Sequence, residues 1–263
     1  MPADRIESLL SSHEVAVEGR LVQASNATFF GHVGEDDDAI PCVYKPVRGE
    51  RPLWDFPEGT LAGREVATYA VNRLAGWDVV PVTVMGDGPF GPGMVQQWIE
   101  EDPDKSLVDL VPPGAVPDGW RHVLDAYDQR DRPIALVHAD EPQLRRLALL
   151  DIVVNNADRK GGHVLVDADG HVRGCDHGLT FHLEHKLRTV LWGWAGEAFT
   201  DDECGALHRL ADALSKPATQ QSLQQLVAGP ELTRVRRRVR RLLTDGTFPV
   251  PGGGWPSIPW PAF

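Results

Sequence analysis

The amino-acid sequence predicts an α+β fold with two lobes, a small β-rich N-terminal lobe containing one helix and a larger, mainly helical C-terminal lobe. Three observations predict this arrangement. Short apolar or alternating segments fill the first third of the chain, helical periodicity dominates the last half, and a polar, proline-containing stretch lies between them. The length of 263 residues suits one large domain or two lobes that share a cleft. We therefore expect the lobes at residues 1–99 and 100–263, with the boundary near residues 98–104.

The first lobe is expected to consist of strands around one helix. Residues 61–74 place apolar side chains at helical spacing and are followed by Gly76, a common helix-ending residue. A cluster of glycine and proline at residues 86–93 predicts a hairpin. The predicted strands are residues 19–23, 29–33, 40–45, 80–85 and 94–99.

The second lobe is expected to be helical with one hairpin. It follows a polar crossover at residues 100–119, and the hairpin spans residues 164–176 with a tight turn at Asp169-Gly170. Residues 249–263 are rich in proline and glycine, which predicts an extended tail held by its aromatic side chains. The predicted helices are residues 120–129, 143–154, 200–215, 222–227 and 232–243.

Composition and charge narrow the classes of partner. The formal net charge of -12 argues against sequence-independent binding of nucleic acid. No segment approaches the roughly 20 apolar residues of a transmembrane helix, and the N-terminus lacks the pattern of a signal peptide. Cys42, Cys175 and Cys204 form no CxxC pair, so neither a disulfide framework nor a structural zinc site is indicated. We therefore expect a cytoplasmic protein with no nucleic-acid partner and no transmembrane segment.

The residues that best indicate chemistry lie between positions 151 and 181. A nearly continuous apolar helix leads into a polar loop that contains Asp158, and the hairpin then returns a second aspartate, Asp176, to the same neighbourhood. Two carboxylates presented in this way can bind a divalent cation and orient a hydroxyl group. Gly178 is expected to let the backbone turn away from this site.

The first lobe supplies further candidates. Lys45 ends a predicted strand, from which its amine can reach into a cleft, although a solvated strand-end lysine is the more common case. Glu65, early in the following helix, can pair with it. The turn after the first strand contains Ser25, Asn26 and Thr28, which can offer donors to phosphate oxygens, although most such turns bind nothing.

Taken in order, these segments resemble the protein-kinase-like superfamily, specifically the phosphatidylinositol 3- and 4-kinases and related small bacterial kinases. The resemblance covers residues 19–181 and is most specific over residues 151–181. That family carries a D-R-x-x-x-N motif followed by a hairpin and a second aspartate in a context like I-D-x-G. The corresponding residues here are Asp158-Arg159-Lys160-Gly161-Gly162-His163 and Cys175-Asp176-His177-Gly178-Leu179.

The resemblance implies a two-lobed kinase-like enzyme that binds ATP with Mg²⁺ or Mn²⁺. Such an enzyme transfers the γ-phosphoryl group to a hydroxyl acceptor, which here is a protein, a small metabolite or an inositol lipid. Asp158 would orient or deprotonate the acceptor hydroxyl, and Asp176 would bind the metal. Arg159 and Lys160 would add positive charge at the phosphoryl oxygens.

The same resemblance assigns the nucleotide contacts. Lys45 would contact the α- and β-phosphates while pairing with Glu65, and the turn at residues 25–28 would cover the phosphates. The adenine would hydrogen-bond the backbone of a hinge. The hinge residues are Gln96, Gln97, Trp98 and Ile99.

One position departs from the family pattern. His163 stands where the family usually has the asparagine that ligates a second metal, and imidazole suits Mn²⁺ better than Mg²⁺. A shifted cation preference, a single bound metal and impaired catalysis all remain open as consequences. A nucleotide-binding pseudokinase that acts through a protein partner and a kinase-fold adenylyltransferase therefore stay as alternatives to a kinase.

An arginine-rich segment near the C-terminus has two interpretations. Residues 233–243 place six arginines on a predicted helix. They can contact an anionic lipid or an acidic partner, or they can form a solvated face while Val235, Val239 and Leu242 pack inward. We favour the solvated face and keep peripheral contact through residues 234–241 as the alternative.

Overall fold

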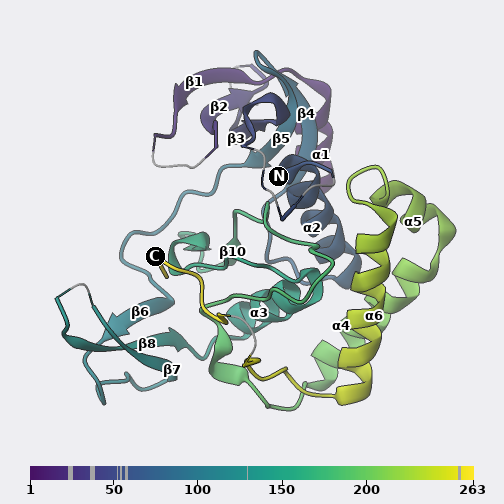
Figure 1. Ribbon diagram of the computed structural model, residues 1–263. Helices are drawn as coiled ribbons and strands as arrows, with labels where there is room; N and C mark the ends of the chain where they lie inside the picture. Colours follow the sequence, from purple (N-terminus) through teal and green to yellow (C-terminus); the bar gives the residue numbers. More distant parts are fainter. Residues whose placement is uncertain are drawn as a thin grey trace.

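Within the residues that it describes, the computed structural model combines antiparallel sheets with six α-helices (Figure 1). It describes residues 1–22, 26–35, 39–51, 53, 55–56, 59–128, 130–253 and 256–263. The helices are α1 (Ala3–Ser12), α2 (Leu61–Ala75), α3 (Pro142–Val154), α4 (Asp201–Ser215), α5 (Pro217–Leu223) and α6 (Gly229–Asp245). The strands are β1 (Ala16–Arg20), β2 (Phe29–Val33), β3 (Ile40–Pro46), β4 (Thr83–Gly88), β5 (Gly91–Gln97), β6 (Val108–Val111), β7 (Trp120–Tyr127), β8 (Pro133–Ala139), β9 (Val164–Val166) and β10 (Val172–Gly174).

The first third of the chain forms one antiparallel sheet in the order β1-β2-β3-β5-β4. This confirms the five predicted strands, with β1 and β5 displaced toward the N-terminus and β4 toward the C-terminus of the predicted ranges. Burial alternates along β3, where Cys42 and Tyr44 are fully buried, so the two-residue periodicity of a half-buried strand was a reliable signal. The N-terminal helix α1 packs on β4 and β5, so residues 1–99 hold two α-helices where one was predicted.

Helix α2 begins and ends where the sequence predicts. The side chain of Thr60 accepts a hydrogen bond from the N–H of Gly63, which caps the first turn. Gly76 closes the last turn with φ of 74°, a conformation that glycine adopts without a steric penalty. The helix contacts β4 and β5 on one side and α4 on the other, so it connects the sheet to the helical part of the molecule.

A three-stranded sheet, ordered β6-β8-β7, contradicts two predictions. The predicted helix at residues 120–129 is wrong because these residues form β7, and the predicted polar crossover contains β6. The register of β7 against β8 shifts between His122 and Leu124. This bulge breaks the two-residue alternation and leaves Val123 and Leu124 as adjacent apolar residues, a pattern that imitates a helix.

Helices α3, α4 and α6 and the hairpin follow the prediction, with changes at their ends. Strands β9 and β10 pair around the Gly170 turn, and α3 is buried along most of its length. The predicted helix at residues 222–227 is largely wrong, because α5 spans Pro217–Leu223 and residues 224–227 are not helical. Proline is favoured in the first helical turn, which suits the start of α5 at Pro217. In α6 the apolar residues pack inward as expected, and Glu231 forms a buried ion pair of 2.5 Å with Arg64 of α2.

The C-terminal tail is held by backbone hydrogen bonds and by the packing of Ile258, Ala262 and Phe263. The carbonyl of Ser257 accepts hydrogen bonds from Thr189 N and Trp192 Nε1, and the carbonyl of Ala262 accepts one from Gly161 N. Trp260 is 80% exposed, so that aromatic side chain does not anchor the tail as predicted. In the described part of the chain, no helix has the length and apolar character needed to cross a membrane.

Candidate functional site

Three charged residues from distant parts of the chain meet at one point. Lys45 comes from the end of β3, Glu65 from α2, and Asp176 from the loop after β10. The Lys45 Nζ atom lies 2.7 Å from Oε1 of Glu65 and 2.8 Å from Oδ1 of Asp176. The Glu65 side chain is buried and that of Asp176 is 49% exposed, so the cluster runs from the interior to solvent. The predicted pair of Lys45 and Glu65 is present in the structure.

The charges in this cluster stabilise one another. Lys45 holds the pKa of Asp176 well below its usual range. Burial would lower the pKa of Lys45, but Asp176 and Glu65 outweigh that effect and raise it. At neutral pH the cluster therefore presents an ionised carboxylate and a charged ammonium group beside solvent.

The backbone changes direction at Asp176 through an uncommon conformation. Asp176 itself has φ of 57°, in the left-handed region that non-glycine residues seldom adopt. The next N–H, that of His177, donates to Oε2 of Glu65 over 3.3 Å. Asp176 thus redirects the backbone just before the turn at residues 178–179, which includes Gly178 as expected, and α2 helps to hold this segment.

Asp158 lies in a loop that two asparagines fix to the end of α3. Asn155 ends the helix with φ of 58°, and its side chain bonds the backbone of residues 182, 184 and 186. The Asn156 side chain accepts from Asp158 N and donates to Asp151 Oδ1 over 2.8 Å. The position of Asp158 is therefore set by backbone and side-chain hydrogen bonds.

The carboxylate of Asp158 is partly buried beside a cation. Burial raises its pKa, and the Lys160 ammonium partly opposes that shift. Lys160 Nζ lies 3.5 Å from Asp158 Oδ2, and both side chains remain accessible to solvent. A carboxylate with a raised pKa is a better proton acceptor than an ordinary surface aspartate. Both predicted residues thus lie together at an accessible edge of the loop.

Arg159 lies in a different environment from the predicted one. Its side chain is fully buried, and Nε donates to Asp151 Oδ2 over 2.8 Å. The other guanidinium nitrogens contact Asp151 Oδ1, the carbonyls of His163 and Cys175, and His177 Nε2. Arg159 therefore joins the loop to the strand that leads into Asp176. The expectation that it supplies charge to phosphoryl oxygens is wrong, because a buried and fully engaged guanidinium cannot reach them.

His163 presents an unprotonated nitrogen to Asp176. Its Nδ1 lies 3.1 Å from the carbonyl oxygen of Asp158, which can only accept, so Nδ1 carries the proton. Burial lowers the pKa of His163 to about 4, which leaves the ring neutral at pH 7. Nε2 then faces Oδ2 of Asp176 over 3.5 Å with no proton between them. An imidazole lone pair beside a carboxylate suits a divalent cation.

The carboxylate of Asp176 and the imidazole of His163 fit a cation only when another ligand supplies the rest of its coordination shell. No group of three or more His, Cys, Asp and Glu side chains within the described ranges could hold a metal ion. Mg²⁺ usually takes one or two carboxylates from the protein and its other ligands from phosphates and water. Asp176 and His163 match that pattern for a cation that arrives with a phosphate ligand.

The predicted phosphate-covering turn is only partly described. Ser25 lies outside the described residues. The side chain of Asn26 accepts from Arg51 N over 3.0 Å. Thr28 is buried, and its hydroxyl donates to the carbonyl of Asn26, so it does not offer a free donor to a phosphate as we expected.

The predicted hinge begins inside β5, which contains Gln96 and Gln97, and continues past the end of the strand. The N–H groups of Gln97 and Trp98 are bonded to the carbonyls of Val82 and Pro41. The side chain of Gln96 is buried and donates to Thr83 Oγ1. In this structure, the backbone donors of Gln97 and Trp98 are therefore engaged within the sheet, which differs from the prediction. Ile99 continues beyond the strand and is half-buried.

A buried hydrogen-bond network beneath the Asp158 loop was not predicted from the sequence. Asp151, Asn156 and His177 support Asp158 and Asp176 without reaching solvent. In the sequence, Asp151 interrupts the apolar run that forms α3. A buried aspartate must be paired, so this interruption could have revealed the network.

Comparison with known proteins gives a relative in sequence and a similar solved structure. No family model matches the chain. Among solved structures, the chain is similar to the proinflammatory kinase CtkA of Helicobacter pylori, with a TM-score of 0.44, 9% sequence identity, and coverage of 90% of this chain and 94% of that one. Over 269 residues it is 47% identical to Protein Rv2133c of Mycobacterium tuberculosis, which covers 99% of this chain and 96% of the relative. At this identity over nearly the whole length, the chain belongs to the family of Rv2133c.

Proposed function

We propose that this protein is an ATP-dependent phosphotransferase with a two-lobed, protein-kinase-like fold. In this proposal residues 1–99 and 100–263 form the lobes, and the nucleotide lies between them. The contact that carries the proposal is the ion-pair cluster in which Lys45 touches both Glu65 and Asp176. A lysine held by a helix carboxylate next to a metal-binding aspartate is the arrangement that kinases use to position ATP phosphates.

Lys45 has the position and charge required to bind phosphate oxygens. Its ammonium is fixed by Glu65 and borders solvent through Asp176, so a nucleotide phosphate can replace part of the contact with Asp176. Asp176 would then bind the cation, with His163 as a second protein donor. The cation would neutralise charge on the phosphates during transfer.

Asp158 is suited to hold the acceptor hydroxyl and take its proton. The hydroxyl oxygen would form a bond to the γ-phosphorus, the bond from that phosphorus to the bridging oxygen of ADP would break, and ADP would leave. The raised pKa of Asp158 favours proton acceptance, and Lys160 beside it can offset negative charge on the transferred group. Arg159 holds this loop in place through its buried contacts with Asp151 and the carbonyl of Cys175.

The proposal is tested by following label from ATP. The protein is incubated with a divalent cation, a bacterial extract as the source of acceptors, and ATP labelled at the γ- or the α-phosphate. We expect γ-label in an acceptor together with ADP, and loss of transfer in Asp158→Asn. Asp169→Asn, on the exposed hairpin turn, is the matched control and should retain transfer. Transfer of the α-label would instead establish an adenylyltransferase, and absence of both transfers would overturn the proposal.

A further inference from the structure

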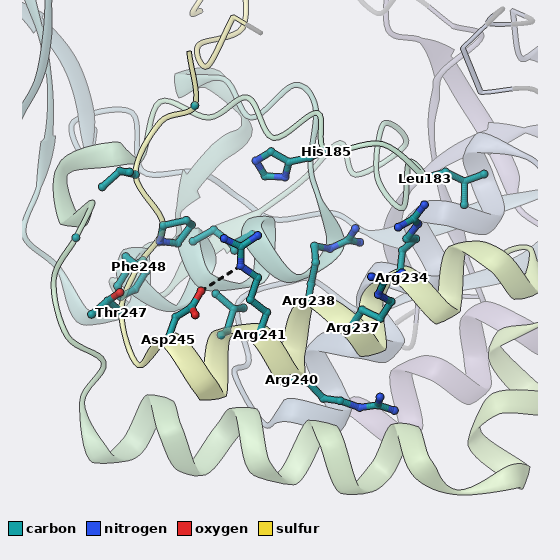
Figure 2. A pocket seen from close by; sticks show the side chains of 16 residues that line it. Leu183, His185, Arg234, Arg237, Arg238, Arg240, Arg241, Asp245, Thr247 and Phe248 are labelled. Atoms are coloured by element: carbon teal, nitrogen blue, oxygen red, sulfur yellow. Dashed lines mark hydrogen bonds and ion pairs between the residues drawn. The ribbon is translucent and has the colours of Figure 1, made fainter. Parts of the chain in front are cut away.

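A cavity of about 860 Å³ lies away from the acidic site, against the arginine-rich helix α6 (Figure 2). Its walls come from α6, from the end of α3, from the segment around His185, and from the chain that follows α6. None of the residues that form the proposed ATP site is among its lining residues. A volume of this size is typical of a site for a small molecule.

Four arginines form a stripe along α6 beside this cavity. Arg234, Arg237, Arg238 and Arg241 follow the i, i+3, i+4, i+7 spacing that brings side chains to one face of a helix. Figure 2 shows Arg238 extending into the space below His185, whereas Arg240, which also borders the cavity, projects in a different direction from the helix. The stripe therefore concentrates positive charge on one wall.

Arg238 forms the buried part of this wall. Its Nε donates to the carbonyl of Val153 in α3 over 2.9 Å, which fixes the guanidinium in place. Its Nη2 is buried and has no hydrogen-bond partner among the described residues. Burial and the neighbouring Arg234 lower the pKa of Arg238 to about 10. A buried donor without a partner is costly, and an anion that displaced the atoms covering Nη2 would remove that cost.

Acidic side chains do not balance this charge. Asp245 is the acidic residue in the lining, and it pairs with Arg241 over 3.1 Å at an exposed end of the stripe. On the facing wall, burial together with Arg238 and Arg241 lowers the pKa of His185. The described part of the chain thus places a surplus of cations around the cavity although the protein as a whole is acidic.

We propose that this cavity binds a soluble small molecule that carries two or more phosphate groups. Guanidinium groups donate two parallel hydrogen bonds to a phosphate, which makes arginine the preferred residue for phosphate recognition. Arg234 and Arg241 are seven positions apart, about 10 Å along the helix axis, so the stripe can hold more than one phosphate. Ile152, Leu242 and Phe248 supply an apolar wall for the remainder of the ligand. A concave site of this kind fits a small molecule better than a flat membrane surface.

Isothermal titration with inorganic tripolyphosphate tests this assignment. The titration is run in chelator, so that metal-dependent nucleotide binding does not contribute. We expect one saturable site that is weakened at least about tenfold in Arg234→Gln and in Arg238→Lys, because the first variant removes a charge and the second removes the bidentate geometry. Arg234 is exposed, so its replacement should not impair folding.

Controls separate this site from general charge attraction and from the proposed ATP site. Arg236→Gln, on the same helix but outside the cavity lining, and Asp176→Asn should both bind tripolyphosphate as the unmodified protein does. Binding should also shift the imidazole resonances of His185. Absence of saturable binding, equal weakening by Arg236→Gln, or association only with phosphatidylserine vesicles would each overturn the proposal.

Discussion

Lys45 and Asp176 are 131 positions apart in the sequence, and the Nζ atom of Lys45 lies 2.8 Å from Oδ1 of Asp176. The contact joins the end of β3 to the loop that follows β10. Glu65 holds the same ammonium from α2. The arrangement brings the charges needed to bind a phosphate and a cation to one solvent-accessible point, and it makes this contact the centre of the proposed function.

Removal of the Lys45 charge should reduce both nucleotide binding and stability. In Lys45→Met the buried Glu65 loses its cation, and the pKa of Asp176 should rise toward its usual value. Because the Asp176 side chain is half exposed, we expect a loss of roughly 1–3 kcal/mol in the free energy of unfolding, less than for a fully buried pair. Calorimetry below the melting temperature should detect no binding of ATP.

The control for this prediction is Lys105→Met, which breaks an exposed pair with Asp102. It should alter the free energy of unfolding by less than about 0.5 kcal/mol and leave ATP binding intact. Normal ATP binding by Lys45→Met would contradict the assigned role of Lys45.

Replacement of His163 should change the preferred cation. In His163→Asn an amide oxygen takes the place of the imidazole nitrogen, and oxygen ligands favour Mg²⁺ over Mn²⁺. We expect the ratio of ATP affinity in Mn²⁺ to that in Mg²⁺ to fall about tenfold. His171→Asn, on the exposed hairpin, should leave the ratio unchanged. An unchanged ratio in His163→Asn would show that His163 does not face the cation.

The buried ion pair of Arg159 and Asp151 should be essential for folding stability. Both side chains are completely buried, so Asp151→Asn leaves Arg159 with an uncompensated charge. We expect a loss of about 3–5 kcal/mol in the free energy of unfolding, measured by urea denaturation. Arg132→Gln, which breaks an exposed pair with Asp128, should cost less than about 0.5 kcal/mol. Similar small effects for the two variants would refute the structural role of Arg159.

The buried His138 should make the protein less stable in acid. Its Nε2 accepts a hydrogen bond from Gly193 N, so the ring is neutral in the folded protein. Burial lowers its pKa from 6.5 to about 4. The unfolded chain therefore takes up a proton near pH 6.5, whereas the folded chain does so only near pH 4. The contribution of His138 is complete above this window and falls by roughly 3 kcal/mol as the pH drops to 4.

Urea denaturation between pH 7 and pH 4 measures this effect. The unfolding free energy should decline less steeply in His138→Gln, although His163 and His177 continue to contribute because burial lowers their pKa as well. His122→Gln removes an exposed imidazole and should keep the original slope. Identical slopes for His138→Gln and the unmodified protein would contradict the prediction.

A methyl group at Gly161 should release the C-terminal tail. A Cβ atom at this position would lie 2.3 Å from the ring of Phe263, whereas one at Gly162 would meet nothing within 4 Å. Phe263 is half exposed and can move aside, so we expect Gly161→Ala to fold and to expose the tail to carboxypeptidase. Gly162→Ala should remain protected, and the double variant Gly161→Ala, Phe263→Ala should digest as Phe263→Ala alone. Equal protection of Gly161→Ala and Gly162→Ala would disprove the contact.

Local patterns in the sequence were sufficient for most of the individual elements. The apolar pattern of residues 40–45 identified β3, and the helical spacing of apolar residues with the Gly76 stop defined α2 within about one residue. The bulge at His122 hid β7, because a local shift in register changes the spacing of apolar residues without any turn residue to mark it.

The candidate site was predictable in its residue types but not in their environments. The motif placed Asp158 and Arg159 side by side in sequence, yet one borders solvent and the other is completely buried. Spacing alone does not tell which of two adjacent polar residues faces the interior. Arg159 is the buried one because it pairs with Asp151 of α3 and bonds the carbonyl of Cys175. These partners come together only in the folded protein, so the local sequence does not reveal them.

The central claim is that Asp176 and Lys45 bind ATP with a divalent cation. Calorimetric titration with ATP in Mg²⁺, in Mn²⁺ and in chelator tests it most directly, with Asp176→Ala in parallel. We expect binding that requires a cation, is tighter with Mn²⁺, and disappears in Asp176→Ala. Binding that is unaffected by chelator and by Asp176→Ala, or no binding under any condition, would contradict the claim.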